Sequence, residues 1–140
     1  GITAPVLKFS NVSSDPPVVV QGGGQTIYKT ILSSANHTVK NISTDMHQYY
    51  SPWEGGPWMT FIDITVNECG EHSGLCPLVP GKPVRVVSVH PPLAKLTPAG
   101  WYRSHQTYID ADTKEKLGCV DMHFKYQHTP KLEPEPSLVV

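Results

Sequence analysis

One stretch decides the fold class: Cys119-Val120-Asp121-Met122-His123-Phe124-Lys125-Tyr126-Gln127. Its apolar and polar side chains alternate, and successive side chains of a β-strand point to opposite sides of the sheet. The apolar face of this stretch comprises Val120, Met122, Phe124 and Tyr126. The stretch therefore predicts a strand with one buried face and one face in water.

A second stretch, residues 61–66, alternates in the same way, with Ile62, Ile64 and Val66 on one face. Its β-branched side chains suit a pleated, half-buried surface. Weaker strand signals lie at residues 6–9, 17–21, 26–32, 39–42, 84–89 and 101–109. Clusters of Gly, Pro, Asn or Asp separate these segments, and no window keeps the helical period over a helical length. The pattern predicts an all-β domain, either a sandwich or a small barrel.

The length and composition set the domain organisation. A chain of 140 residues suits one domain with one core. We expect residues 1–127 to form it, and residues 128–140, which hold three prolines, to form an extended tail. No apolar run approaches the roughly 18 residues of a membrane span, so we expect a mature, soluble chain.

Charge and motif content exclude several classes of function. Charged residues make up 16% of the chain and the net charge is −1, so no basic field favours nucleic acid as a partner. The chain shows no nucleophile elbow, Cys-His signature, glycine-rich phosphate loop or paired-carboxylate motif. We therefore expect no enzyme activity, no catalytic residue and no cofactor.

Three glycosylation sequons begin at Asn11, Asn36 and Asn41, among polar or turn-forming neighbours. A single sequon is a loose pattern, but three together with paired cysteines favour secretion.

Two cysteines, Cys69 and Cys76, enclose a polar loop that contains glycine. A disulfide across so short a loop would stabilise the fold by roughly 2.5 kcal/mol in the chain-entropy model. The alternative is a zinc site formed by these two residues with His72 and Cys119. Structural zinc sites usually show paired short Cys or His spacings, which this sequence lacks, and the seven histidines show no metal-ligand spacing. We therefore expect a disulfide and no metal.

The motifs around these cysteines resemble those of a known family. They are Cys69-Gly70-Glu71-His72-Ser73-Gly74-Leu75-Cys76-Pro77-Leu78, then Pro80-Gly81-Lys82, Thr97-Pro98-Ala99-Gly100-Trp101-Tyr102 and Leu117-Gly118-Cys119. In this order they resemble the ML-domain lipid-recognition family, which includes the Niemann-Pick type C sterol carrier and the phosphatidylglycerol/phosphatidylinositol transfer proteins. The resemblance covers roughly residues 6–126, about one domain.

The resemblance implies an immunoglobulin-like β-sandwich of two antiparallel sheets with an apolar cavity between them. It implies a protein, secreted or in the lumen of the endolysosomal system, that binds or transfers a sterol, a fatty acid or a phospholipid. The resemblance also implies that the protein makes transient contact with membranes or with a membrane lipid transporter. Many members link the final-strand cysteine to one in the first strand region, where this chain has Ser10. The resemblance thus implies that Cys119 is a free thiol, buried or half-buried.

Alternation and the resemblance together predict a set of cavity-lining side chains: Leu32, Trp58, Phe61, Ile62, Ile64, Val66, Val86, Val89, Leu93, Trp101, Tyr108, Val120, Met122, Phe124 and Tyr126. Val86 and Val89 fall on opposite faces of a regular strand, so both point inward only if a bulge intervenes. Residues 49–59 combine five large apolar side chains with Pro and Gly. We expect them outside regular structure, either lining the cavity mouth or folded onto their own cluster.

Two other functions fit the same fold class. An immunoglobulin-like recognition module would have a solid core and bind its partner with its loops. A lipid-dependent innate immune sensor would hold a lipid without transferring it.

Overall fold

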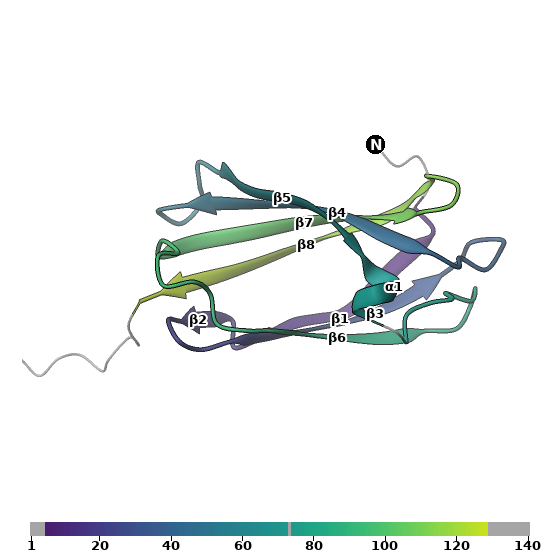
Figure 1. Ribbon diagram of the computed structural model, residues 1–140, viewed down its shortest axis with the longest axis horizontal. Coiled ribbons are helices and arrows are strands. Elements are labelled where there is room, and N and C mark those ends of the chain that lie inside the picture. The colour runs from purple at the N-terminus through teal and green to yellow at the C-terminus, as the bar shows by residue number, and fades with distance from the viewer. Residues whose placement is uncertain (1–4, 73, 129–140) are drawn as a thin grey trace, which may run out of the picture.

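The computed structural model describes residues 5–72 and 74–128. In this part of the chain two β-sheets stack as layers, with one short helix between them at one edge (Figure 1). The elements are β1 Leu7–Asp15, β2 Val18–Val20, β3 Gln25–Ser33, β4 Ile42–Ser51, β5 Met59–Asn67, α1 Glu68–Glu71, β6 Val84–His90, β7 Gly100–Asp110 and β8 Lys116–Gln127. Of the predicted tail, residues 129–140 lie outside the described residues.

The two sheets differ in width. The smaller has the strand order β1-β3-β6 and the larger has the order β2-β8-β7-β4-β5. The all-β sandwich is thus confirmed. Neighbouring strands are antiparallel except β2 and β8, which are parallel, so the expectation of two purely antiparallel sheets needs that correction. A hydrogen bond of 2.8 Å from the Val6 N–H to the Leu117 carbonyl ties the β1 edge to β8.

The strand register shows which side chains face the space between the sheets. The Lys29 ammonium on β3 donates a 2.9 Å hydrogen bond to Gln106 Oε1 on β7, so these two side chains point inward from opposite sheets. Gln106 pairs with Val120 on β8 and with Met46 on β4. Every second residue from these positions shares their face. The predicted inward face of β8, with Val120 and Tyr126, is therefore confirmed.

Strand β4 is the largest departure from the expected elements. A strand was expected at residues 39–42, but Val39 forms only an isolated bridge with Leu78, and the strand runs from Ile42 to Ser51. Polar residues occupy both faces of β4, for example Thr44 inside and Asp45 outside, so no alternation marks it. Part of residues 49–59, expected outside regular structure, belongs to the ends of β4 and β5.

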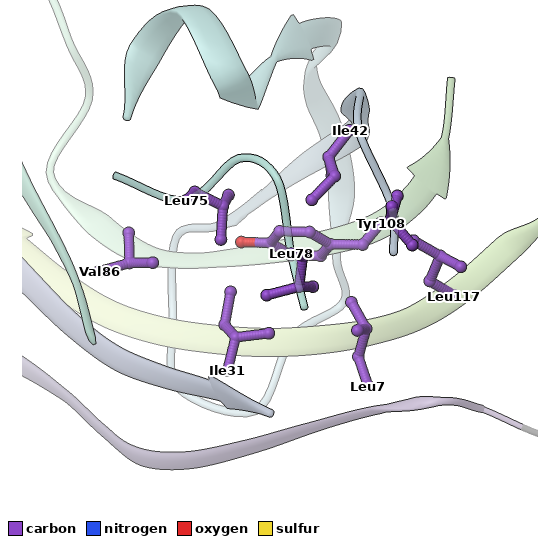
Figure 2. Packing of buried hydrophobic residues seen from close by; sticks show 9 residues of the cluster. Leu7, Ile31, Ile42, Leu75, Leu78, Val86, Tyr108 and Leu117 are labelled. Carbon is purple, nitrogen blue, oxygen red and sulfur yellow. The ribbon is translucent and has the colours of Figure 1, made fainter. Parts of the chain in front are cut away.

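The buried side chains form two clusters. The larger lies at the end of the sandwich that carries α1, and Figure 2 shows its aliphatic side chains around the Tyr108 ring. Its buried members are Leu7, Ile31, Val39, Ile42, Leu75, Leu78, Val86, Tyr108 and Leu117. The smaller cluster has Val19, Tyr102 and Tyr126 as its buried members, with Tyr50, Leu93 and Phe124 partly buried around them. One end of the interior is therefore closely packed, and the other is partly exposed.

A substitution in the larger cluster tests this packing. Leu117 is fully buried, so Leu117→Ala should lower the free energy of unfolding by about 2–5 kcal/mol, through lost apolar burial and the cavity left behind. Urea denaturation followed by circular dichroism measures the change. Leu96, which is 95% exposed, is the control, and Leu96→Ala should change the free energy by less than about 0.5 kcal/mol. Equal effects of the two substitutions would contradict the assignment of the core.

Candidate functional site

The inner face of strand β5 is left uncovered. Ile64 pairs with Met46, which pairs with Gln106, so Ile64 shares the inward face of the larger sheet. Ile62, two residues away, points the same way. Their exposed fractions are nevertheless 45% for Ile64 and 39% for Ile62. Because the facing sheet has only three strands, it does not cover this edge.

Phe61 completes the uncovered apolar strip. It falls at the irregularity in the β4–β5 register, and its ring lies 5.3 Å from that of the inward-facing Tyr102. Phe61 is 38% exposed. We call Phe61, Ile62 and Ile64 the open strip. Three neighbouring apolar side chains on the inner face of a sheet thus contact solvent rather than the opposite sheet.

Aromatic side chains lie beside the open strip. The Tyr102 ring stacks on Phe124 at 5.1 Å between centroids and lies 5.2 Å from Tyr50. The Tyr102 hydroxyl donates to the Pro98 carbonyl, and burial raises the pKa of this phenol, with further effects from Tyr50 and Tyr126. The phenol oxygen of Tyr126 is buried with no hydrogen-bond partner among the described residues. The rings form an apolar wall that continues inward from the open strip.

The middle of the interior is polar, which the sequence did not indicate. Lys29 is only 4% exposed, and within the described part of the chain its ammonium donates a hydrogen bond to Gln106. Its ammonium also lies 5.4 Å from the centre of the Tyr108 ring. Burial lowers the pKa of Lys29, and the negative charge of Glu68 opposes that effect. A buried lysine is unusual, because desolvation disfavours its charged form.

Glu68 is the buried acid of the same region, and it already has partners. Thr44 Oγ1 donates a 2.8 Å hydrogen bond to Glu68 Oε1, and Glu68 Oε2 lies 3.7 Å from His72 Nε2. His72 Nε2 is also 3.2 Å from Ser88 Oγ on β6. This contact joins α1 to the edge of the smaller sheet. The β5–β6 edge is therefore closed near α1, while the open strip stays exposed farther along β5.

Most of the predicted cavity residues lie on the inner side. Strand register and contacts place these inward: Phe61, Ile62, Ile64, Val66, Val86, Tyr108, Val120, Met122, Phe124 and Tyr126. Leu93 packs against the smaller buried cluster. The structure thus gathers these side chains around one interior. Inner-face residues that sequence reasoning missed include Lys29, Met46, Gln48, Tyr102 and Gln106, while Tyr50 belongs to the segment 49–59 expected at the cavity mouth.

Four predicted cavity residues do not face the interior. The β3–β6 register is regular, so Val89 points outward, opposite to Val86, and is 77% exposed. The bulge that would have turned it inward does not occur in β6. Leu32 likewise points away from its neighbour Ile31, which is buried at 1% exposure. It lines an open hollow of about 560 Å³ at the outer end of the smaller sheet, together with residues 5–8 and 80–81.

The other two are tryptophans on the outer face of the larger sheet. Trp101 alternates with the inward-facing Tyr102, and Lys125 lies over its ring at 4.8 Å. The Trp58 ring lies 6.0 Å from His123, which belongs to the outward set of β8. Sequence alternation around Trp101 points to this orientation, whereas nothing in the sequence shows where the loop places Trp58.

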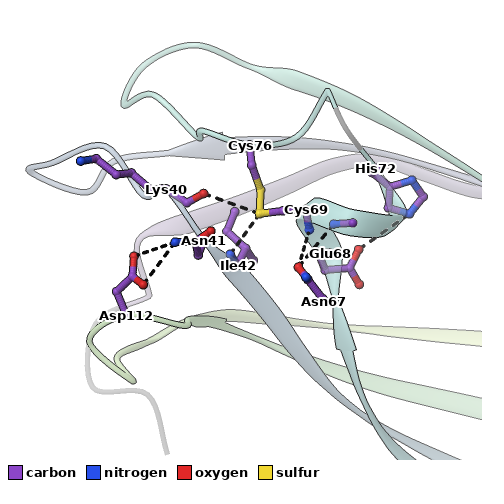
Figure 3. The surroundings of a disulfide bond; sticks show 10 residues. Lys40, Asn41, Ile42, Asn67, Glu68, Cys69, His72, Cys76 and Asp112 are labelled. Atoms are coloured by element: carbon purple, nitrogen blue, oxygen red, sulfur yellow. Dashed lines mark hydrogen bonds and ion pairs between the residues drawn. A yellow bond between two sulfur atoms is a disulfide. The ribbon is translucent and has the colours of Figure 1, made fainter.

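The cysteine loop is closed by the expected disulfide, Cys69–Cys76, which excludes the zinc alternative (Figure 3). Asn67 caps α1, since its Oδ1 accepts hydrogen bonds from the Cys69 and Gly70 N–H groups at 3.1 and 3.3 Å. The Ile42 N–H contacts Cys69 Sγ at 3.2 Å. These contacts fix the loop against β4 at the closely packed end of the sandwich.

Cys119 is a free thiol and is exposed, so the expectation of a buried or half-buried thiol is wrong. The physical reason is its position on β8, where it alternates with the inward-facing Val120.

The remaining expectations concern glycosylation, metal binding, membrane spans and the cellular compartment. The sequon residues Asn11, Asn36 and Asn41 are all exposed, and Asn41 Nδ2 donates to the Asp112 carboxylate. Over residues 5–72 and 74–128, no group of three or more His, Cys, Asp or Glu side chains is arranged to hold a metal ion. No helix within these ranges is long and apolar enough to cross a membrane. The disulfide fits an oxidising compartment.

Comparison with known proteins identifies the fold. A crystal structure of a Niemann-Pick type C2 protein from the Japanese carpenter ant matches with a TM-score of 0.64 and 18% sequence identity, over 90% of this chain and 97% of that one. The chain has the fold of a Niemann-Pick type C2 protein. At this identity the likeness concerns the fold alone. No protein-family model and no curated protein matches the sequence.

A second solved structure is less similar. The CARDB domain of the PF1109 protein from Pyrococcus furiosus matches with a TM-score of 0.49 and 14% identity, over 89% of this chain and 90% of that one. This match is too weak to define a fold.

The position of Cys119 predicts its reactivity. In the native protein, iodoacetamide should modify Cys119 within the time that it modifies an exposed peptide thiol, while Cys69 and Cys76 stay unmodified in their disulfide. Mass spectrometry of the intact protein and of its peptides counts and locates the added groups. A thiol that reacts only in denaturant would contradict the outward position of Cys119.

Proposed function

We propose that this protein binds a lipid and holds the hydrocarbon chain of that lipid between its two sheets. The observation that carries the proposal is the open strip, where Phe61, Ile62 and Ile64 face inward and yet are 38–45% exposed. Apolar surface left in water at the mouth of an interior marks a place where an apolar ligand binds. Burying a lipid chain there removes water from both surfaces.

The energy available from such burial is large enough for binding. Each CH₂ group transferred from water contributes about 0.8 kcal/mol, so a long acyl chain gains on the order of 10 kcal/mol before ordering costs are subtracted. The aromatic wall formed by Tyr50, Tyr102 and Phe124 offers apolar contact along that path. Binding of this kind needs no catalytic residue, and we propose a carrier rather than an enzyme.

The likeness in fold to a Niemann-Pick type C2 protein supports the same proposal. The disulfide supports a secreted or lumenal location, where the protein would collect a sterol, a fatty acid or a phospholipid. A recognition module with a solid core would not leave the inner face of β5 in water.

Transfer of a lipid requires contact with a membrane, and one end of the molecule suits it. Trp53, in the β4–β5 turn, is 58% exposed, and Leu96, in the β6–β7 loop, is 95% exposed. Figure 1 shows both connections at the same end of the sandwich. Lys95 lies next to Leu96 in the same loop. An exposed tryptophan and leucine beside a lysine are residue types that insert at a lipid surface.

Lipid binding can be measured directly. Purified protein is extracted with organic solvent for lipid mass spectrometry, and delipidated protein is titrated with a fluorescent long-chain lipid. Ile64→Asp should weaken binding about tenfold or more, because it places a charge where the chain enters. Val87→Asp is the matched control, since Val87 has the same exposed fraction of 45% but lies on the outer face of β6.

Two results would contradict the proposal. One is the failure of delipidated wild-type protein to bind any of a sterol, a fatty acid and a phospholipid. The other is an equal loss of affinity in Ile64→Asp and Val87→Asp, which would place binding away from the open strip.

A further inference from the structure

Lys29 is a buried cation without an anionic partner at ion-pair distance. Among the ion pairs in the described part of the chain, none includes its ammonium. Its contacts are the neutral Gln106 amide at 2.9 Å and the face of the Tyr108 ring at 5.4 Å. An ammonium has three donors, and a buried charge is normally paired. Among the described residues, only one hydrogen-bond acceptor, Gln106 Oε1, therefore serves the three donors of this ammonium.

The nearby ionisable groups do not supply the missing anionic partner. Glu68 is committed to Thr44 and His72, and its charge acts on Lys29 only from beyond ion-pair distance. The other titratable groups that couple to this region are His72, His90 and Tyr108, and the histidines are not anions. Burial raises the pKa of the Tyr108 phenol, which keeps it neutral, and its buried oxygen has no hydrogen-bond partner among the described residues. Among the described residues, no carboxylate lies within ion-pair distance of the Lys29 ammonium.

The position of Lys29 relates this cation to the open strip. On β3, Lys29 pairs with Val86, which belongs to the closely packed cluster, while Ile27 pairs with Ser88, the residue that contacts His72. On the facing sheet, Gln106 connects through Met46 to Ile64 of the open strip. Lys29 therefore lies where the closely packed end begins, in the same cross-strand row as the open strip.

We propose that Lys29 binds the ionised carboxylate of a long-chain fatty acid, whose hydrocarbon chain lies between the sheets toward the aromatic wall. This inference rests on the proposed function and names the class of lipid. The carboxylate would replace the water lost on burial and give the ammonium a charge-assisted hydrogen bond. A fatty alcohol or methyl ester of the same length would fill the same apolar space and leave the cation without an anion.

The side of the interior available to the chain also follows from the packing. Toward α1, Ile31 and Val86 are buried at 1% and 3% exposure and leave no exposed inner face. In the opposite direction the partly buried Met122 and Phe124 and the exposed Phe61 lie beside the buried Tyr102 ring. A carboxylate at Lys29 therefore directs the chain away from the disulfide end.

The test compares three ligands of one chain length: palmitic acid, hexadecanol and methyl palmitate. Each is titrated into delipidated wild-type protein at pH 7.4, below the concentration at which it aggregates or separates from water, by displacement of a fluorescent lipid. Wild type should bind the acid at least about tenfold more tightly than the alcohol or the ester. Lys29→Met keeps the length of the side chain without its charge and should reduce that ratio to about one. Lys116→Met, which removes an exposed lysine on β8, should leave the ratio unchanged.

The outcomes separate the two proposals. If wild type binds none of the three ligands, the proposed lipid carrier fails and this inference fails with it. If wild type binds all three equally, lipid binding stands and the role of Lys29 is refuted. A preference for the acid that persists in Lys29→Met also refutes it. The wild-type comparison decides the carboxylate preference even if Lys29→Met does not fold.

Discussion

The interior depends on one mismatch: a five-stranded sheet packs against a three-stranded sheet. A sheet stabilises the fold by burying its inner face against the other layer. Three strands cannot cover five, and the uncovered part falls on β5, whose inner side chains include Ile62 and Ile64. At the opposite edge the Val6–Leu117 hydrogen bond ties the layers together. The sandwich is therefore closed along one edge and exposes apolar surface along the other.

The two ends of the interior are held differently. At one end, Leu75 in the loop closed by the Cys69–Cys76 disulfide and Leu78 just after it pack into the larger cluster. Loop segments therefore complete the core there. At the other end the packing rests on rings, and the partly buried Tyr50 and Phe124 leave room for rearrangement. The stabilising contacts thus concentrate at one end.

Alternation in the sequence predicts the inner faces of β5 and β8 because their two faces differ sharply in polarity. The same rule gives the outward positions of Cys119, Trp101 and Val89, for which the family resemblance suggested otherwise. Strand β4 does not follow the rule because polar residues occupy both of its faces, such as Thr44 inside and Asp45 outside. The position of Lys29 could not be predicted either. A lysine in a strand is normally placed toward water, and the hydrogen bond from Lys29 to Gln106 on the facing sheet shows that this one points inward.

The polar middle of the interior has a physical consequence. An apolar side chain at position 29 would fill the space beside Val86 without the desolvation cost of a charge, and such replacements are often neutral or stabilising. The lysine therefore does not serve the packing of the unliganded sandwich. An anion that reaches it removes that cost, and a ligand that binds only the native state stabilises that state. Under the proposed function, an apolar chain would enter at the open strip and its ionised end would pair with the buried ammonium. The mismatch between the sheets and the unpaired charge would then have one explanation in common.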